Sequence, residues 1–561
     1  MYFSCTVPVP AIQGKITLKK LRGAVYVYYE YDRDYKPERK YAIPRRACIG
    51  KLMSEGVMKP NENFRRYLPQ EPIPEERNAS ARSSCLRCGA FFVLRKLAEE
   101  CRLPEFLKGR FEGGDASLAL DLACYSLVTE GNAAQYYPDY AYGHPLFTEG
   151  MRVYSDAKVS DFLRSVSADQ TLGFLEDWNA VREHGDRIYV SYDATNKHSQ
   201  SGNLDLAEPG HAKDGGAKPV FNYAIAHDLT LGDPLFYEEY PGSIADVSQL
   251  SCMLAKASAY GYSNVGFILD RGYFSEANLR LMDEGGHAFV IMIRGRKRLM
   301  RELVLRHRGT FETSRACAVP RYGAYGMTVT GKLCPGDTRD RHIHIFHSVS
   351  REAAERSALE ADIARMADWL SRHEGQEVTP DSAMTALFDL TFDATGKRLL
   401  FARERTEAIE EELRLCGYFG IATSEPMTAS EALELHGAVP SEKLFRGDKS
   451  YLGNGSLRAC SGEAVSARVF IEFVALILRN RMYRRLKAAV RVSGRKANYM
   501  NVPAAVRELE KIEMIREADG TYRLDHAVTA TQKAILSVFG LDEDFVRRQA
   551  DWLGRTLDGG K

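Results

Sequence analysis

The sequence lacks several features that would place it in a common class of protein. No apolar run reaches the roughly 18–20 residues that a membrane span needs. The start, MYFSCTVPVPAIQGK, has no charged segment followed by an apolar one, so it predicts no secretory signal. The chain also has no GxxxxGKS/T loop and no GxGxxG after a strand. These absences favour a cytoplasmic protein that needs neither a membrane nor a nucleotide cofactor.

A metal-binding cysteine framework is absent as well. The eleven cysteines are scattered, which suits a reducing compartment. Cys85 and Cys88 have metal-ligand spacing, but no second CxxC or HxxxH supplies the remaining ligands of a structural zinc site. We expect two buried thiols at a helix start instead. His342 and His344 share a strand face without a carboxylate or cysteine at matching spacing, and this pattern predicts a surface strand.

Positive charge is unevenly distributed along the 561 residues, whose formal net charge is only +1. Residues 1–70 hold fourteen Lys and Arg against six Asp and Glu, a balance of +8. A second basic stretch follows Glu472. It contains Arg479, Arg481, Arg484, Arg485, Lys487, Arg491, Arg495 and Lys496. Such segments fit a polyphosphate partner, although a solvated helix face explains the charge equally well.

The pattern of apolar residues divides the chain into several domains and predicts an α/β fold. In residues 187–293, stretches such as PVFNYAIAHD, NVGFILD and AFVIMIR read as strands and alternate with helices, which predicts a mixed sheet with helical crossovers. NVGFILD is nearly continuous in apolar residues, as a central strand should be. MIREADGTYRLD predicts a hairpin near the end. The expected parts are a basic β-rich region (1–67), a linker (68–84), a helical domain (85–183), the first part of an α/β core (184–293), a β-rich insertion (294–425), a second, helical part of the core (426–499) and a C-terminal helical region (500–561).

Two of the predicted core strands end in an aspartate. Asp193 follows the alternating run RIYVSY, and Asp270 follows the apolar run NVGFIL. Ligands of open α/β sheets bind at the carboxyl ends of such strands. Two carboxylates there could hold Mg²⁺ ions, which prefer oxygen ligands and support phosphoryl transfer. Aspartates that merely cap the next turn are the simpler explanation from these two residues alone.

Several stretches together resemble the Asp-Asp-Glu transposases of bacterial insertion sequences, in the branch with a strand-rich insertion. They are YDATN, LDRGYFS, GYFGIATSEPMTASEAL and SEKLFRGDK. The resemblance implies an RNase H-like core that uses two Mg²⁺ ions, with Mn²⁺ as a substitute, to cleave and join DNA. It also implies double-stranded DNA as partner, in the form of terminal inverted repeats and target DNA, a homodimer on that DNA, and a place at the bacterial nucleoid.

The resemblance assigns the third carboxylate to Glu442, so that Asp193, Asp270 and Glu442 would be both catalytic residues and metal ligands. The family's third motif has Tyr and Arg before this glutamate, where this chain has Leu435 and Ala438. Glu472, an acidic residue in the apolar run RVFIEFVALIL, is the alternative third ligand. The expected DNA-binding residues are Tyr273, Arg446, Lys449, Arg479, Arg481, Arg484 and Arg485.

Three functions follow from this pattern. The first is a metal-dependent DNA transposase. The second is a transposase-derived DNA-binding protein whose catalysis is impaired or lost, because the third motif is degenerate. The third is a nuclease of the same fold that cleaves DNA without joining it.

Overall fold

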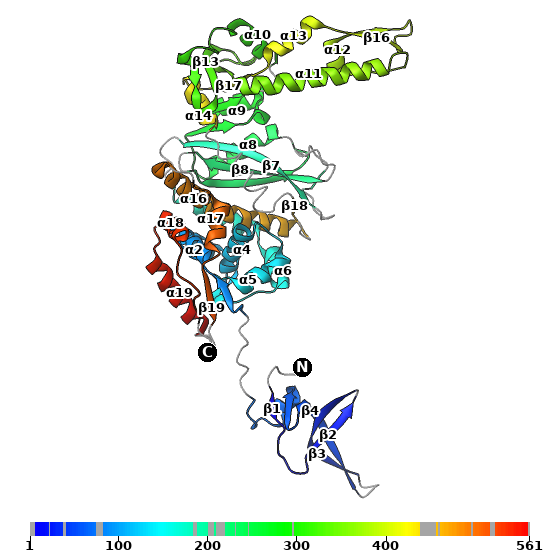
Figure 1. Ribbon diagram of the computed structural model, residues 1–561, viewed down its shortest axis with the longest axis vertical. Helices are drawn as coiled ribbons and strands as arrows, with labels where there is room; N and C mark the ends of the chain where they lie inside the picture. Colours follow the sequence, from blue (N-terminus) through cyan, green and yellow to red (C-terminus); the bar gives the residue numbers. More distant parts are fainter. Residues whose placement is uncertain are drawn as a thin grey trace. The chain divides into compact units, whose positions relative to one another are not determined.

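The computed structural model divides the chain into two compact units, Met1–Ser84 and Cys85–Lys561, and each is described by itself (Figure 1). Only the backbone is described at residues 193–199, 246–247, 271, 297 and 456–457. The described residues are 6–21, 23–36, 41–73, 82–182, 188–199, 207–208, 219–229, 232–244, 246–293, 297–437, 456–457, 461–494, 497–516 and 522–558.

The N-terminal unit is an antiparallel sheet with the strand order β1-β5-β4-β3-β2. Alternation along β3 turns Val27 into a core that also contains Ile49, Met58 and Phe64. The side chain of Asn61 caps the helix that follows the sheet. The elements are β1 (Val7–Pro8), β2 (Ile16–Leu21), β3 (Ala24–Lys36), β4 (Tyr41–Ser54), β5 (Val57–Pro60) and α1 (Glu62–Tyr67).

Helices form the first part of the larger unit. Apolar residues surround most of α4, and the helix is buried because α3 and α16 pack against it. Ser167 and Gln170 form a capping box at the start of α7. The elements are α2 (Gly89–Glu100), α3 (Leu103–Arg110), α4 (Asp115–Thr129), η2 (Ala134–Tyr136), α5 (Tyr137–Gly143), η3 (Glu149–Met151), α6 (Asp156–Ser165) and α7 (Ala168–Ala180).

A large mixed sheet follows, and its first five strands lie in the order β9-β8-β7-β10-β11. β7, β10 and β11 are parallel, whereas β8 is antiparallel to both of its neighbours. All five residues of β10 are buried, so the prediction of a central strand in NVGFILD is confirmed. The elements are β7 (Ile188–Ser199), β8 (Val220–Asp228), β9 (Pro234–Pro241), α8 (Asp246–Ala259), β10 (Val265–Leu269), η4 (Arg271–Tyr273), α9 (Glu276–Glu284) and β11 (Ala288–Met292).

The segment predicted as a β-rich insertion extends this same sheet. β17 adds to the free edge of β11, and β14, β13 and β12 follow it outward, all antiparallel. A long charged helix and a separate hairpin, β15-β16, share a small core of their own around Leu370 and Phe388. The elements are α10 (Lys297–His307), η5 (Arg315–Cys317), β12 (Ala318–Val319), η6 (Pro320–Tyr322), β13 (Ala324–Gly331), β14 (Arg341–His347), α11 (Val349–Arg372), α12 (Ser382–Leu387), β15 (Phe388–Phe392), β16 (Leu399–Glu404), α13 (Thr406–Leu415) and β17 (Tyr418–Thr423).

The prediction of a surface strand around His342 and His344 is wrong. β14 lies inside the sheet between β13 and β17, and His344 is fully buried. Its Nδ1 and Nε2 atoms lie 2.9 and 3.0 Å from the hydroxyl oxygens of Thr328 and Thr423. Burial lowers the pKa of His344 to about 4, so the ring is neutral at pH 7. The histidine is therefore a hydrogen-bonded core residue.

The C-terminal elements pack against the helices at the start of the larger unit. The predicted hairpin is confirmed as β19-β20, and β6 (Cys85–Arg87) adds to it as a third strand. Cys88 is buried and Cys85 partly buried, and burial raises the pKa of both thiols. The remaining elements are α14 (Ala429–Gly437), β18 (Ser456–Leu457), α16 (Gly462–Ser493), α17 (Val502–Leu509), β19 (Glu513–Arg516), β20 (Tyr522–Leu524), α18 (Ala530–Val538) and α19 (Glu543–Asp558).

The two faces of the large sheet are covered by different helices. On one face, α14 packs over β10, β11, β13, β14 and β17, and Ile268 and Val290 point into this core. On the other face, Phe267 and Leu269 belong to a core that also contains Leu250 and Met253 of α8. Alternate residues of β10 thus belong to different layers. None of the helices in the described parts of the chain is both long and apolar enough to span a membrane.

Candidate active site

The two aspartates predicted as metal ligands lie at the same level of two neighbouring parallel strands. Tyr192 of β7 pairs with Leu269 of β10, and Asp193 and Asp270 are the next residues along the chain. Asp270 follows the last residue of β10, whereas the prediction that Asp193 ends its strand is wrong, because β7 continues to Ser199 in a ladder with β8. Adjacent strands lie about 4.8 Å apart, so this register brings the backbones of the two aspartates side by side. The side chain of Asp193 is not among those that the structure describes, and the register therefore fixes only its backbone position.

Asp270 lies on a short turn between β10 and α9. Its carbonyl oxygen accepts a hydrogen bond of 3.0 Å from the backbone N–H of Tyr273, which closes the turn η4. Ser275 then caps α9 by accepting from the N–H of Asn278 at 3.1 Å. The Asp270 side chain is exposed, and it has no ion-pair partner among the side chains that the structure describes. Its carboxylate is thus available to a ligand.

Tyr273 belongs to the layer beneath this turn. Its ring is 1% exposed and packs edge-on against Tyr192, with 5.5 Å between the ring centroids. The Tyr192 hydroxyl donates a hydrogen bond of 2.6 Å to Glu238, whose pKa burial raises. The prediction that Tyr273 binds DNA needs a correction, because its buried ring is a packing residue beside Tyr192.

The candidate third carboxylate, Glu442, lies outside the described residues, and so do Arg446 and Lys449. The helix that precedes it, α14, covers the sheet face to which Ile268 belongs. Leu435 is partly buried in that core, and α14 ends at Gly437. Glu442 therefore follows the last residue of α14 by five positions in the sequence.

The alternative third carboxylate, Glu472, faces the helical region. It is 1% exposed on α16, and the side-chain amide of Asn132 donates a hydrogen bond of 3.0 Å to its Oε1 atom. A small cavity beside it is lined by Tyr125 of α4, Val159 of α6 and Arg468 of α16. These neighbours place Glu472 in the layer between α4, α6 and α16.

The described side chains contain no group of three His, Cys, Asp or Glu residues close enough together to hold a metal ion. The side chain of Asp193 and the whole of Glu442 fall outside the described part of the chain. The predicted triad thus consists of one described carboxylate, one described backbone position and one residue beyond the described part.

A buried ion-pair cluster occupies the other end of the strands. Asp233, in the loop between β8 and β9, is 1% exposed, and the Nη2 atom of Arg481 lies 2.6 Å from its Oδ2 atom. Arg182 and Arg484 approach the same carboxylate at 3.4 and 3.8 Å. Burial raises the pKa of Asp233, and the three guanidinium groups act against that rise. Asp233 is a partner that sequence patterns did not indicate.

These contacts bear on the prediction that the arginines of α16 bind DNA. Arg481 and Arg484 face Asp233, and Arg485 pairs with Glu100 at 2.7 Å. Arg479 is only 7% exposed. The charges predicted to hold DNA are therefore largely compensated or buried within the protein. The exposed cations of this helix lie further along, at Lys487 and Arg491.

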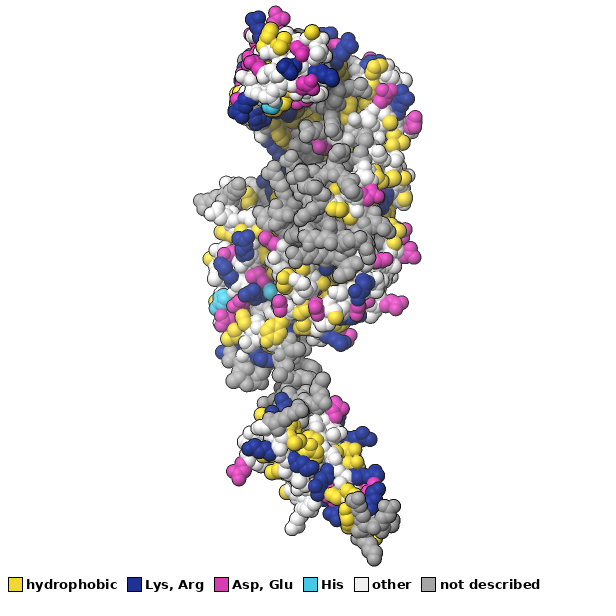
Figure 2. All heavy atoms as spheres, turned by 90° about the vertical axis from the view of Figure 1, so that its right-hand side faces the viewer, with side chains coloured by type: hydrophobic (Ala, Val, Ile, Leu, Met, Phe, Trp, Pro, Cys, Tyr) yellow, Lys and Arg dark blue, Asp and Glu magenta, His cyan; other side chains and the backbone are white. Residues whose placement is uncertain are grey.

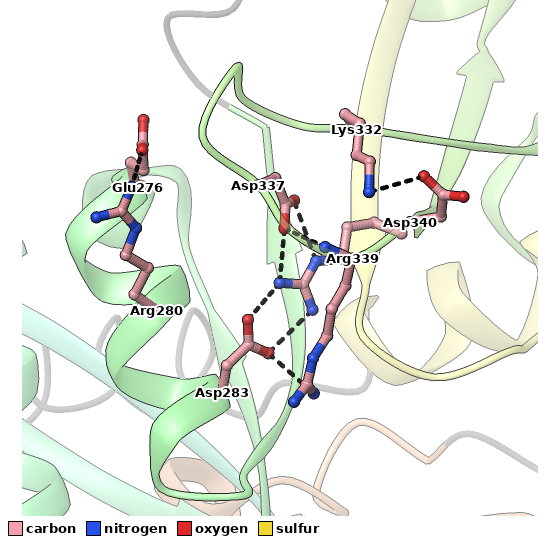
Figure 3. Close-up of polar contacts among 8 residues, drawn as sticks. Glu276, Arg280, Asp283, Lys332, Asp337, Arg339 and Asp340 are labelled. Atoms are coloured by element: carbon pink, nitrogen blue, oxygen red, sulfur yellow. Dashed lines mark hydrogen bonds and ion pairs between the residues drawn. The ribbon is translucent and has the colours of Figure 1, made fainter.

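A second cluster ties α9 to the loop before β14 (Figure 3). Arg341 is 2% exposed, and its Nη1 atom donates to Asp283 of α9 at 3.0 Å. Its Nε and Nη2 atoms donate to Asp337 at 3.1 and 3.0 Å. Arg339, at the rim, lies 3.7 Å from Asp283. The cluster borders a cavity of about 320 Å³ and joins the added strands to the helix that follows Asp270.

Comparisons with known proteins include a weak structural likeness. No family model and no curated protein matches the chain. The structure is similar to a cryo-EM structure of piggyBac transposase in a synaptic complex with hairpin DNA, with a TM-score of 0.31 and 9% sequence identity. The match covers 84% of this chain and 74% of that chain. A TM-score this low carries no argument, so the function is inferred from this chain's own residues.

Proposed function

We propose that this protein is a metal-dependent DNA transposase of the Asp-Asp-Glu type, with an RNase H-like core. The observation that carries the proposal is the register of β7 and β10, which sets Asp193 beside Asp270 at the same level of two parallel strands. The strand order β9-β8-β7-β10-β11, with only β8 antiparallel to its neighbours, supports an RNase H-like core. The motifs around Asp193, Asp270 and Glu442 supply the family.

The donor set suits hard divalent cations. Asp270 offers an exposed carboxylate without a competing ion-pair partner among the described side chains. Carboxylate oxygens are the ligands that Mg²⁺ and Mn²⁺ prefer. In the proposal, Asp193, Asp270 and Glu442 hold two such ions. A pair of ions in such a site stabilises the attacking and leaving oxygens of an in-line displacement at a DNA phosphate.

The third position is assigned to Glu442 because the family's third motif falls on it and because Glu472 is already engaged within the protein. α14 covers the sheet face of Ile268, two residues before Asp270, and Glu442 follows the end of α14 by five residues. Glu472 lies on α16, is 1% exposed and accepts a hydrogen bond from the side-chain amide of Asn132. We therefore expect Glu442→Gln to abolish metal-dependent cleavage and Glu472→Gln, which can keep the bond to Asn132, to retain it.

The proposal is tested with the sequences that flank the coding region, cloned into a plasmid. Wild-type protein should nick this DNA and join its ends only with Mg²⁺ or Mn²⁺. Asp270→Asn should reduce both reactions to background, because it removes one negative ligand of the ions. Asp161→Asn, on an exposed position of α6, is the matched control and should retain full activity. Equal cleavage by the Asp270 and Asp161 variants across a metal titration contradicts the proposal.

A catalytically impaired, DNA-binding descendant is the second candidate, and the packing of α14 favours it. Leu435 stands where the family has tyrosine and is packed into the core beside Ile268, so this position presents no polar group to DNA. End-specific binding without cleavage at any metal concentration would support this candidate. A nuclease of the same fold is distinguished by a pre-cut DNA end, which a transposase joins to target DNA and a nuclease does not.

A further inference from the structure

The N-terminal unit presents one row of side chains that crosses four strands. Lys19 of β2 lies opposite Tyr26 of β3, Tyr26 opposite Lys51 of β4, and Lys51 opposite Lys59 of β5. Directly opposed residues of antiparallel strands point to the same face of the sheet. The row is therefore three ammonium groups around one tyrosine. We call Lys19, Tyr26, Lys51 and Lys59 the lysine–tyrosine row.

The row lies on the face opposite the core of the unit. Val27, Ile49 and Met58, each adjacent in sequence to the strand positions of this face, are fully buried. Tyr28 lies one row along on the same face as Tyr26, and the Lys19 Nζ atom sits 5.0 Å from its ring centroid. This contact holds the ammonium group at the sheet surface. Figure 2 shows dark blue side chains among yellow ones on the visible side of this unit.

The charges of the row are not compensated, in contrast to those of the arginines in the same sheet. Glu30 pairs with Arg33 and Arg46, and Asp34 pairs with Arg45. Within the described part of the unit, no carboxylate lies within ion-pair distance of the three lysines of the row. A partner that brings negative charge to this face therefore meets free cations and displaces no internal ion pair.

We propose that the lysine–tyrosine row binds single-stranded DNA. Lysines bind the phosphates, and the half-buried ring of Tyr26, which lies between Lys19 and Lys51 in the row, stacks on an unpaired base. Proteins that hold single strands combine cations along the backbone with aromatic rings under the bases. A face with lysines alone would bind duplex DNA as well as single strands, whereas the ring in the middle of the row favours bases that are not paired. The inference rests on the proposed function only for the identity of the polyanion as DNA.

The test uses the full chain and a fluorescent oligo-dT strand, with anisotropy measured across a salt series. Lys19→Gln/Lys51→Gln/Lys59→Gln should lower the slope of log affinity against log salt by about 2, since each phosphate contact of a single strand contributes roughly 0.7. Lys15→Gln/Lys20→Gln/Lys36→Gln removes the same charge from exposed positions outside the row and is the matched control. Equal slopes for the two triple variants overturn the proposal.

The tyrosine gives a second, independent readout. Tyr26→Leu should weaken binding of oligo-dT about tenfold and leave binding of a duplex of the same length unchanged, whereas Tyr26→Phe keeps the ring and should bind as wild type. Equal loss on single strand and duplex, or no loss on either, refutes the stacking role. Neither variant touches the Asp270 turn, so a failure here is separable from a failure of metal-dependent cleavage.

Discussion

The Arg341 cluster permits a quantitative prediction about how the added strands are attached to the core. Arg341 is 2% exposed and serves two carboxylates, those of Asp283 and Asp337, which are 16% and 4% exposed. Removal of one member of a buried ion pair leaves an uncompensated charge and costs about 3–5 kcal/mol. Arg341→Met keeps a side chain of similar length but no charge. We expect this variant to lose that amount of local stability at pH 7.

The adjacent arginine provides the matched control. Arg339 approaches the same Asp283 at 3.7 Å, but its side chain is 64% exposed. An exposed pair contributes about 0–1 kcal/mol. Arg339→Met should therefore change local stability little. The triple variant Arg341→Met/Asp283→Asn/Asp337→Asn removes both carboxylate charges and should recover most of the loss, because the penalty comes from the buried charges that remain.

Native-state hydrogen exchange of the β14 amides measures this quantity without requiring that the whole chain unfolds in two states. At 1.4 kcal/mol for each factor of ten, a loss of 3–5 kcal/mol accelerates exchange by about 10²- to 4 × 10³-fold, provided that local opening governs exchange. Acceleration below about fivefold for Arg341→Met, or equal acceleration for Arg339→Met, would refute the argument that burial decides the contribution of each arginine.

Two further predictions concern other residues. His344 has a folded-state pKa of about 4, below its ordinary value of 6.5. The free energy of unfolding should therefore fall by up to roughly 3 kcal/mol as the pH falls from about 7 to 4. His344→Asn should remove this dependence, which denaturation curves at pH 7 and pH 5 measure. Arg484→Gln/Arg485→Gln should change the salt dependence of DNA binding less than Lys487→Gln/Arg491→Gln does. The reason is that Arg484 and Arg485 have carboxylate partners, whereas Lys487 and Arg491 have none among the described residues. The reverse order in an anisotropy series would contradict this.

Local sequence patterns predicted individual elements better than their partners. The continuous apolar run before Asp270 gave a central strand, and the polar turn in MIREADGTYRLD gave a hairpin, because burial and turn chemistry are written into adjacent residues. The strand that contains His344 was placed at the surface because its alternation resembles that of a half-exposed strand. Which strand edges pair with one another is a long-range property, and the periodicity of one segment does not contain it.

Ion-pair partners that are distant in the sequence cannot be predicted from a local pattern either. The arginines of α16 resemble a polyanion-binding stripe until the loop that holds Asp233, about 250 residues earlier in the chain, folds against them. A basic stretch predicts a polyanion-binding surface only when its cations have no carboxylate partner in the folded chain. The lysines of the lysine–tyrosine row have no such partner among the described residues, whereas Arg481, Arg484 and Arg485 each have one.

The register of the sheet also bears on the proposed catalysis. Ile268 of β10 pairs with Ser191 of β7, and Asp193, two positions on, pairs with Ile225 of β8, which pairs with Tyr237 of β9. The ring of Tyr237 packs on Phe473 of α16 with 5.2 Å between centroids, so α16 and α14 cover different strands of the same face. The face alone therefore does not choose between the two glutamates. Glu442 is preferred because Glu472 is 1% exposed and already accepts a hydrogen bond from Asn132, and the two glutamate variants test this assignment directly.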